Sequence, residues 1–133
     1  MRWVGVDPGT QRVGIAVCDP EERVAVPVEV VPTSAAVPAV RTVATREEAG
    51  GVVVGLPLLL DGSEGEAARL ARRLGERIRR RLDLPVEYED ERFTTVEAER
   101  EGSGGEPRDD VAAALILQQF IDRRRTEGPD ARA

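Results

Sequence analysis

The sequence predicts a single α/β domain with a mixed five-stranded sheet, an antiparallel meander followed by parallel strands, and helices on both faces. Three observations support this fold class. A chain of 133 residues can enclose one hydrophobic core and has no room for a second domain. Three short β-rich segments joined by tight turns open the chain. After them, strand-like segments alternate with segments of helical periodicity, so the element order is β-β-β-α-β-α-β-α-α.

The first half of the chain contains the meander, one helix and a buried strand. The expected elements cover residues 3–6, 13–18, 23–31, 34–49 and 52–55. Pro27 inside the third strand indicates an edge position or a β-bulge, because proline cannot donate a ladder hydrogen bond. Gly50-Gly51 can end the helix. The continuous apolar run Val52–Gly55 is typical of a strand covered on both faces.

The second half follows the same alternation after a loop at residues 57–65. The expected elements are a helix over 66–82, a strand over 85–89, a helix beginning at Val96 behind the capping box of Thr94 and Glu97, a flexible stretch over 101–105 and a buried helix over 111–124. We place the domain at residues 1–125 and expect residues 126–133 to form a disordered polar tail.

One face of the 66–82 helix is rich in arginine, and two interpretations remain open for it. The arginines are Arg69, Arg72, Arg73, Arg77, Arg79 and Arg80. They can form a solvated face supported by ion pairs such as Glu76 with Arg80. Alternatively they form a stripe that attracts phosphate groups.

The composition excludes several classes of chemistry. The chain contains no histidine, lysine or asparagine, which rules out histidine triads, histidine metal sites and lysine-dependent catalysis. Its single cysteine, Cys18, allows neither an internal disulfide nor a cysteine-based zinc site. No apolar run is long enough to cross a membrane and no leader pattern opens the chain, so we expect a cytoplasmic protein without membrane contact. The net charge of −6 argues against a generic nucleic-acid coat, although metal ions would neutralise clustered acids.

Three acidic sites occupy comparable places in the predicted fold. Asp7 ends the first strand, Asp90-Glu91 ends the last strand, and Asp109-Asp110 opens the final helix. Such ends meet at one edge of a mixed sheet, and a carboxylate cluster without histidine suits Mg²⁺ or Mn²⁺. Two such ions about 4 Å apart can activate water and stabilise the leaving oxygen of a phosphodiester.

Each acid also has a purely structural explanation. Asp7 can cap the turn that follows it, and Asp109 and Asp110 can cap a helix and match its dipole. Glu91 can pair with Arg92 at the surface. The joint placement of the three sites favours the functional interpretation.

Four segments, in order and spacing, resemble the YqgF (RuvX) family of bacterial RNase H-like proteins. They are GVDPGTQRVGIAVCD, VVVGLPLLLDGSEG, DERFTTVEAER and DDVAAALILQQFID, and together they span nearly the whole chain. Family members are described as Holliday junction resolvases and as nucleases that process the 5′ end of pre-16S ribosomal RNA. The resemblance therefore implies an RNase H-like fold with an acidic site for metal ions.

The resemblance also implies roles for particular residues. Asp7 and Asp109 match the family's aspartates on the first strand and the final helix, and the DER motif supplies the third acid. We favour Glu91 over Asp90, because strand alternation sends their side chains to opposite faces. Asp90 and Asp110 remain additional candidate ligands. The candidate substrate-binding residues are Gly9, Thr10, Arg12, Arg92 and Thr94.

The chain departs from the family pattern in two places. Only EGSGGEPR separates Arg100 from Asp109, where family members usually carry a longer and often basic segment. Asp110 stands where lysine or serine is more common. It could bind a metal ion or weaken the approach of a phosphate.

The leading functional hypothesis is a metal-dependent endonuclease that processes the 5′ end of pre-16S ribosomal RNA, with ribosomal precursor particles as its partner. A Holliday junction resolvase acting on branched DNA is an alternative. A third hypothesis is a non-catalytic nucleic-acid-binding or ribosome-assembly factor, suggested by the acidic net charge and the shortened segment. We expect a monomer or a homodimer. Nucleotide binding of the actin-like kind is disfavoured, because those folds need two lobes.

Overall fold

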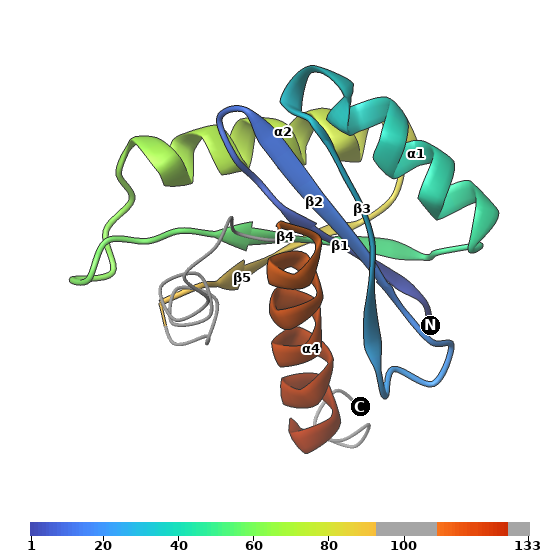
Figure 1. Ribbon diagram of the computed structural model, residues 1–133. Helices are drawn as coiled ribbons and strands as arrows, with labels where there is room; N and C mark the ends of the chain where they lie inside the picture. Colours follow the sequence, from blue (N-terminus) through green and yellow to red (C-terminus); the bar gives the residue numbers. More distant parts are fainter. Residues whose placement is uncertain (93–108, 128–133) are drawn as a thin grey trace.

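The computed structural model describes residues 1–92 and 109–127 (Figure 1). The strands are β1 (Trp3–Asp7), β2 (Arg12–Cys18), β3 (Ala25–Pro32), β4 (Gly51–Leu56) and β5 (Val86–Asp90). The helices are the short 3₁₀ turn η1 (Thr33–Ala35) and the α-helices α1 (Ala36–Arg46), α2 (Glu66–Leu82) and α4 (Asp109–Glu127). None of these helices is both long and apolar enough to cross a membrane.

The five strands form one mixed sheet in the order β3-β2-β1-β4-β5. β1, β2 and β3 pair antiparallel, and β4 pairs parallel with both β1 and β5. This confirms the predicted meander followed by parallel strands. β1 therefore lies at the centre of the sheet, which places its last residue, Asp7, between β2 and β4.

The edge strand β3 carries the irregularity that its proline predicts. The β2–β3 pairing shifts between Ile15 and Ala16, since Ile15 faces Glu29 while Ala16 faces Pro27. One residue of β3 is thus extra, which is the definition of a β-bulge. The bulge and the edge position together accommodate a residue without an N–H donor.

Helices cover both faces of the sheet, with α1 and α2 on one face and α4 on the other (Figure 1). Strand alternation divides the core accordingly. Val4 and Val6 of β1 pack under α1 and α2, whereas Trp3 packs against Phe120 of α4, with ring centroids 4.9 Å apart. The same alternation puts Asp7 on the α4 face. All six residues of β4 are buried, as expected for a strand covered on both sides.

The boundaries of two helices differ from the prediction. α1 ends at Arg46, before Gly50-Gly51, because the turn that follows already contains a left-handed residue, Glu48 (φ 52°). α4 begins at Asp109 and continues to Glu127, so the polar residues at its end are helical where a tail was expected. Thr126 shows why, since its hydroxyl donates to the Asp122 carbonyl one turn earlier. The helix predicted from Val96 and the flexible stretch over 101–105 lie outside the described residues.

Candidate active site

Asp7 is one of two buried charged side chains in the described part of the chain, with an exposed fraction of 4%. It ends the central strand and pairs with Gly14 of β2. On its other side, the β1–β4 ladder pairs Val6 with Val54, so the next residues along the parallel strands, Asp7 and Gly55, lie side by side. The carboxylate therefore has a glycine as its neighbour on each side. Neither glycine has a side chain to fill the space beside it.

The start of α4 rests directly on one of these glycines. A Cβ atom at Gly14 would lie 1.8 Å from the carbonyl oxygen of Asp109 and 2.7 Å from the amide nitrogen of Asp110. Only glycine allows the helix to come so close to β2. The contact brings Asp109, from the far end of the sequence, to the sheet edge where Asp7 lies. The structure thus brings together two of the three acids that the sequence indicates.

Glu91 approaches the same edge over the second glycine. Its amide donates to the Leu56 carbonyl (3.2 Å), which continues the β4–β5 pairing by one step. Its Oε1 atom is buried and lies 3.0 Å from the position that a Cβ on Gly55 would occupy. Gly55 is the neighbour of Asp7, so Glu91 lies on the Asp7 side of the sheet.

Asp90 has a different environment from Glu91. Its carboxylate accepts hydrogen bonds from the Arg92 guanidinium (Nη2 to Oδ2, 2.9 Å) and from the Arg92 amide (2.8 Å). The side-chain bonds from Arg92 lower the pKa of Asp90 below its usual value. Arg92 also donates to the Leu60 carbonyl (3.3 Å) and so joins the end of β5 to the loop after β4. This arrangement makes Asp90 a partner of Arg92 and leaves Glu91 as the acid nearer to Asp7.

Arg12 is placed beside the acids, as its position next to the turn indicates. Its Nε lies 3.1 Å from Oδ2 of Asp109, and about half of its side chain is exposed (49%). Asp110 accepts a hydrogen bond from the Val111 amide (2.9 Å) within the first turn of α4. An exposed arginine at the rim of a carboxylate site can reach an incoming phosphate.

Gly9 and Thr10 form the exposed turn between β1 and β2. A Cβ at Gly9 would lie 2.3 Å from the Arg12 carbonyl oxygen, so the turn itself requires glycine here. Thr33 fixes the turn from outside by donating its hydroxyl to the Gly9 carbonyl (2.8 Å). A contact between this turn and a nucleic-acid backbone stays a prediction, and Thr94 lies outside the described residues.

The acids share one edge of the sheet but do not form a ready ligand set. Among residues 1–92 and 109–127, no group of three or more acidic, cysteine or histidine side chains lies close enough to hold a metal ion. The Asp109 carboxylate faces Arg12 instead. In donor chemistry, however, the three carboxylates suit a hard cation such as Mg²⁺ or Mn²⁺.

Sequence reasoning missed a fourth acid, Glu89. Its side chain is 2% exposed, on the α4 face, and it forms an ion pair with Arg123 and a hydrogen bond with Gln119 (2.5 Å). Strand alternation could have placed Glu89 on the same face as Glu91. The partners could not be found in this way, because their contact depends on how α4 crosses the sheet.

Comparison with solved structures identifies the fold class. Over 95% of its length the chain is similar to 96% of Thermus thermophilus RuvC bound to a Holliday junction substrate, with 19% identity and a TM-score of 0.61. It is also similar to 99% of the fowlpox virus resolvase chain, with 10% identity over 93% of this chain and a TM-score of 0.57. The chain therefore has the RNase H-like fold.

Sequence comparison narrows this class to a family. The family model described as "RuvX: Holliday junction resolvase" matches residues 1–123, and the chain belongs to this nuclease family. A relative from Anaeromyxobacter sp. is 42% identical over 93% of this chain and 98% of its own length. A relative from Lactobacillus johnsonii is 34% identical over 96% and 99%, respectively. Both relatives carry the name "Putative pre-16S rRNA nuclease".

Proposed function

We propose that this chain is a metal-dependent endonuclease that processes the 5′ end of pre-16S ribosomal RNA in the cytoplasm. The observation that carries the proposal is the arrangement around the end of β1. Asp7 lies between Gly14 and Gly55, and Asp109 and Glu91 lie over these two glycines. The name shared by the relatives supplies the substrate.

In this proposal Asp7, Glu91 and Asp109 hold Mg²⁺ or Mn²⁺, which when bound supplies an activated water and stabilises the leaving oxygen. The remaining steps belong to the protein. Arg12, which pairs with Asp109 in this structure, would be available to bind the phosphate if Asp109 held a metal ion. Arg92, fixed by Asp90, offers a second cation at the same edge.

The test is cleavage of a labelled ribosomal RNA precursor with a 5′ extension, in Mg²⁺ or Mn²⁺, by three proteins. They are the wild type, Asp7→Asn, and Asp122→Asn as a matched control at a half-exposed carboxylate paired with Arg125. We expect the wild type and the control to cleave at equal rates and Asp7→Asn to be slower by more than about a hundredfold. Absence of cleavage by the wild type, or equal cleavage by Asp7→Asn, contradicts the proposal.

Branched DNA is a second candidate substrate, because the family model is described as a Holliday junction resolvase. A four-way junction assayed beside the RNA, with the same three proteins, separates the two substrates. Cleavage of the junction and not of the RNA would assign the resolvase activity.

A non-catalytic role in ribosome assembly is favoured by one observation, the ion pair between Arg12 and Asp109 in place of a metal ligand set. Binding of ribosomal RNA that needs no divalent ion and is unaffected by Asp109→Asn, together with no cleavage, would support this role over the nuclease.

A further inference from the structure

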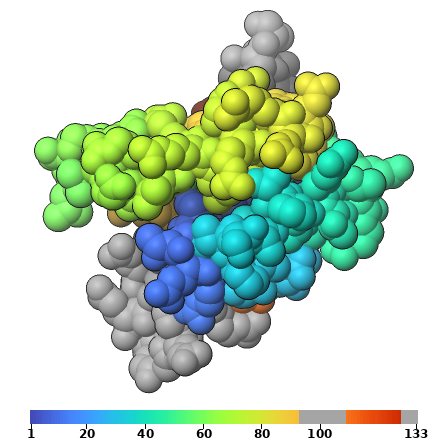
Figure 2. All heavy atoms as spheres, turned by 90° about the horizontal axis from the view of Figure 1, so that it is seen from above, coloured from blue at the N-terminus to red at the C-terminus, as the bar shows by residue number. Residues whose placement is uncertain are grey.

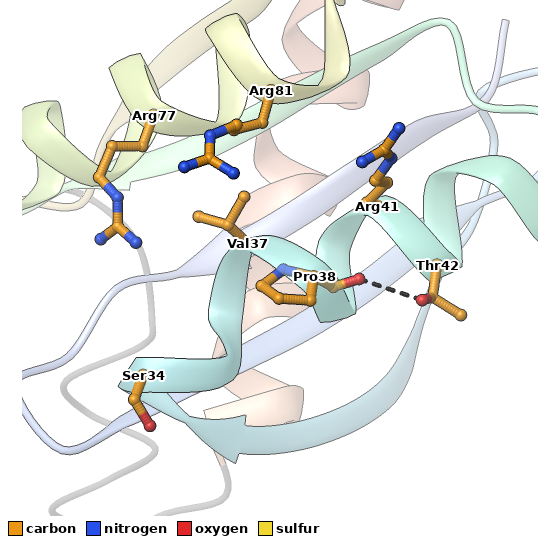
Figure 3. Close-up of a pocket in the computed structure, with 7 residues that line it drawn as sticks. All are labelled: Ser34, Val37, Pro38, Arg41, Thr42, Arg77 and Arg81. Atoms are coloured by element: carbon orange, nitrogen blue, oxygen red, sulfur yellow. Dashed lines mark hydrogen bonds between the residues drawn. The ribbon is translucent and has the colours of Figure 1, made fainter.

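Three arginines line a groove between α1 and α2, on the face of the sheet opposite α4. The groove has a volume of about 380 Å³, and its walls include Val37, Arg41, Thr42, Arg77 and Arg81. The two helices lie side by side on this face (Figure 2). Figure 3 shows the guanidinium groups of Arg77 and Arg81 from α2 and of Arg41 from α1 projecting into the space between the helices. The groove thus concentrates three positive charges on an acidic protein.

These arginines differ in their ion pairs from four other arginines of α2. Arg69 pairs with Glu66, Arg72 with Glu64, and both Arg79 and Arg80 with Glu76. No carboxylate lies within ion-pair distance of Arg41, Arg77 or Arg81 in residues 1–92 and 109–127. The two interpretations of the arginine-rich helix therefore apply to different residues. The paired arginines form a solvated face, and Arg77 and Arg81 face the groove.

A hollow beside the groove reaches the turn that follows Asp7. A neighbouring depression of about 480 Å³ is lined by Pro8, Gly9 and Thr10 at the end of β1 and by Arg73 and Arg77 of α2. Arg77 lines both hollows. A third hollow, of about 360 Å³, shares Arg41 and Arg81 with the groove and is also lined by Glu48. The three hollows are therefore neighbours along α2, and one of them includes the turn after Asp7.

The spacing of the arginines matches a repeating anion. Arg73, Arg77 and Arg81 follow each other at intervals of four residues, which on an α-helix is a rise of about 6 Å each. Successive phosphates of an extended nucleic-acid strand are separated by a distance of the same order. Arginine binds phosphate through paired N–H donors, and the groove supplies these donors without a competing carboxylate.

We propose that the groove between α1 and α2, with Arg41, Arg77 and Arg81, is a second nucleic-acid site that holds backbone phosphates away from the cleaved bond. The identity of this nucleic acid as substrate rests on the proposed function. The shared Arg77 favours a nucleic-acid strand over an acidic protein segment, because it also lines the hollow of Gly9 and Thr10, two candidate substrate-binding residues. The site contacts phosphates only, so it adds affinity without sequence preference.

The test measures binding without cleavage. Fluorescence anisotropy in EDTA, with a labelled RNA hairpin and a labelled four-way DNA junction, compares the wild type with a triple variant, Arg41→Gln, Arg77→Gln and Arg81→Gln. The matched control, Arg23→Gln, Arg69→Gln and Arg79→Gln, removes the same charge from exposed arginines that have carboxylate partners. Thermal unfolding of all three proteins verifies that they are folded.

We expect the groove variant to bind at least about tenfold more weakly than the control. Its plot of log K against log salt should be less steep than that of the control, by about 2 in the magnitude of the slope. Equal binding by the groove variant and the control overturns the proposal. The proposal is also overturned if the wild type binds polyglutamate but not nucleic acid and the groove variant loses this binding. The partner is then an acidic protein segment. EDTA prevents cleavage, so this assay measures binding alone. Equal binding by the two variants would therefore not contradict the nuclease proposal, and an inactive wild type would not contradict the binding result.

Discussion

Two adjacent acids at the end of β5, Asp90 and Glu91, have different surroundings at the level of single residues. Asp90 bonds to both the side chain and the backbone of Arg92, whereas the buried Oε1 of Glu91 lies over Gly55, beside Asp7. A neutral isostere at each position separates the two roles, because both replacements remove one negative charge from neighbouring places.

Loss of a residue that only orients a metal ligand reduces activity by about 10- to 100-fold. Glu91→Gln should reduce the cleavage rate by more than this. Asp90→Asn should reduce the cleavage rate by an amount within that range, because it weakens the hold on Arg92 and leaves the acids near Asp7 in place. The measurement is the single-turnover rate on the RNA precursor at saturating Mn²⁺. A larger loss from Asp90→Asn than from Glu91→Gln would assign the acid role to Asp90.

Asp90 should also contribute a pH-dependent part of the stability. Its folded-state pKa is lowered by the hydrogen bonds from Arg92, so its contribution is fully present above the unfolded pKa of about 3.9. The contribution is lost as the pH falls through the lower folded value. In urea unfolding, the wild type should therefore exceed Asp90→Asn in stability at pH 7, with a smaller difference at pH 3. A difference that grows on acidification would mean that the carboxylate is not stabilised by Arg92.

At the scale of elements, the position of α4 depends on Gly14. The helix start lies so close to β2 that a side chain at this position would overlap the backbone of Asp109. The position of α4, which carries Asp109, thus depends on Gly14 of β2, a residue that takes no part in the chemistry itself. Its substitution tests the placement of the acid without altering any acid.

Gly14→Ser should lower the free energy of unfolding by about 1–3 kcal/mol, the usual cost of overpacking, and should reduce cleavage by shifting Asp109. Gly65→Ser is the matched control, because a Cβ there meets only Leu59 at 3.5 Å and serine is favoured at the N-cap of α2. Urea unfolding and the cleavage assay measure the two effects. If Gly14→Ser retains the wild-type rate, the position of the α4 start does not control activity.

At the scale of the whole molecule, local patterns in the sequence predict the elements and much of their order. The β-branched runs and the change to helical periodicity predict each described strand and helix, and Pro27 predicts the irregular edge. Alternation along β5 also favours Glu91 over Asp90 as the acid near Asp7. The inferences about the fold succeed because each depends on residues that are neighbours in the chain, and the choice of Glu91 stays a prediction.

The features that the sequence does not predict depend on contacts between distant elements. Gly14 is required by a helix that begins 95 residues later, and Glu89 finds its partner Arg123 on that same helix. The division of the α2 arginines into paired ones and groove-lining ones needs the position of α1. Helix ends also escape prediction, since α1 stops before the glycines that follow it. Packing between distant elements, which no local pattern encodes, decides the first three, whereas the helix ends follow the local turn at Glu48 and the bond from Thr126 to Asp122.

Metal binding should couple the candidate active site to the stability of the entire fold. A ligand that binds the folded state alone stabilises it by about 2.7 kcal/mol when present at 100 times its dissociation constant. For a domain of this size, that stabilisation raises the melting temperature by several degrees. Mn²⁺ should therefore raise the melting temperature of the wild type and of Asp122→Asn, and EDTA should reverse the shift. Asp7→Asn should show a much smaller increase, because it removes the central carboxylate of the proposed set. An equal increase in Asp7→Asn would place the bound ion elsewhere, and no increase in the wild type would contradict a metal site at the end of β1.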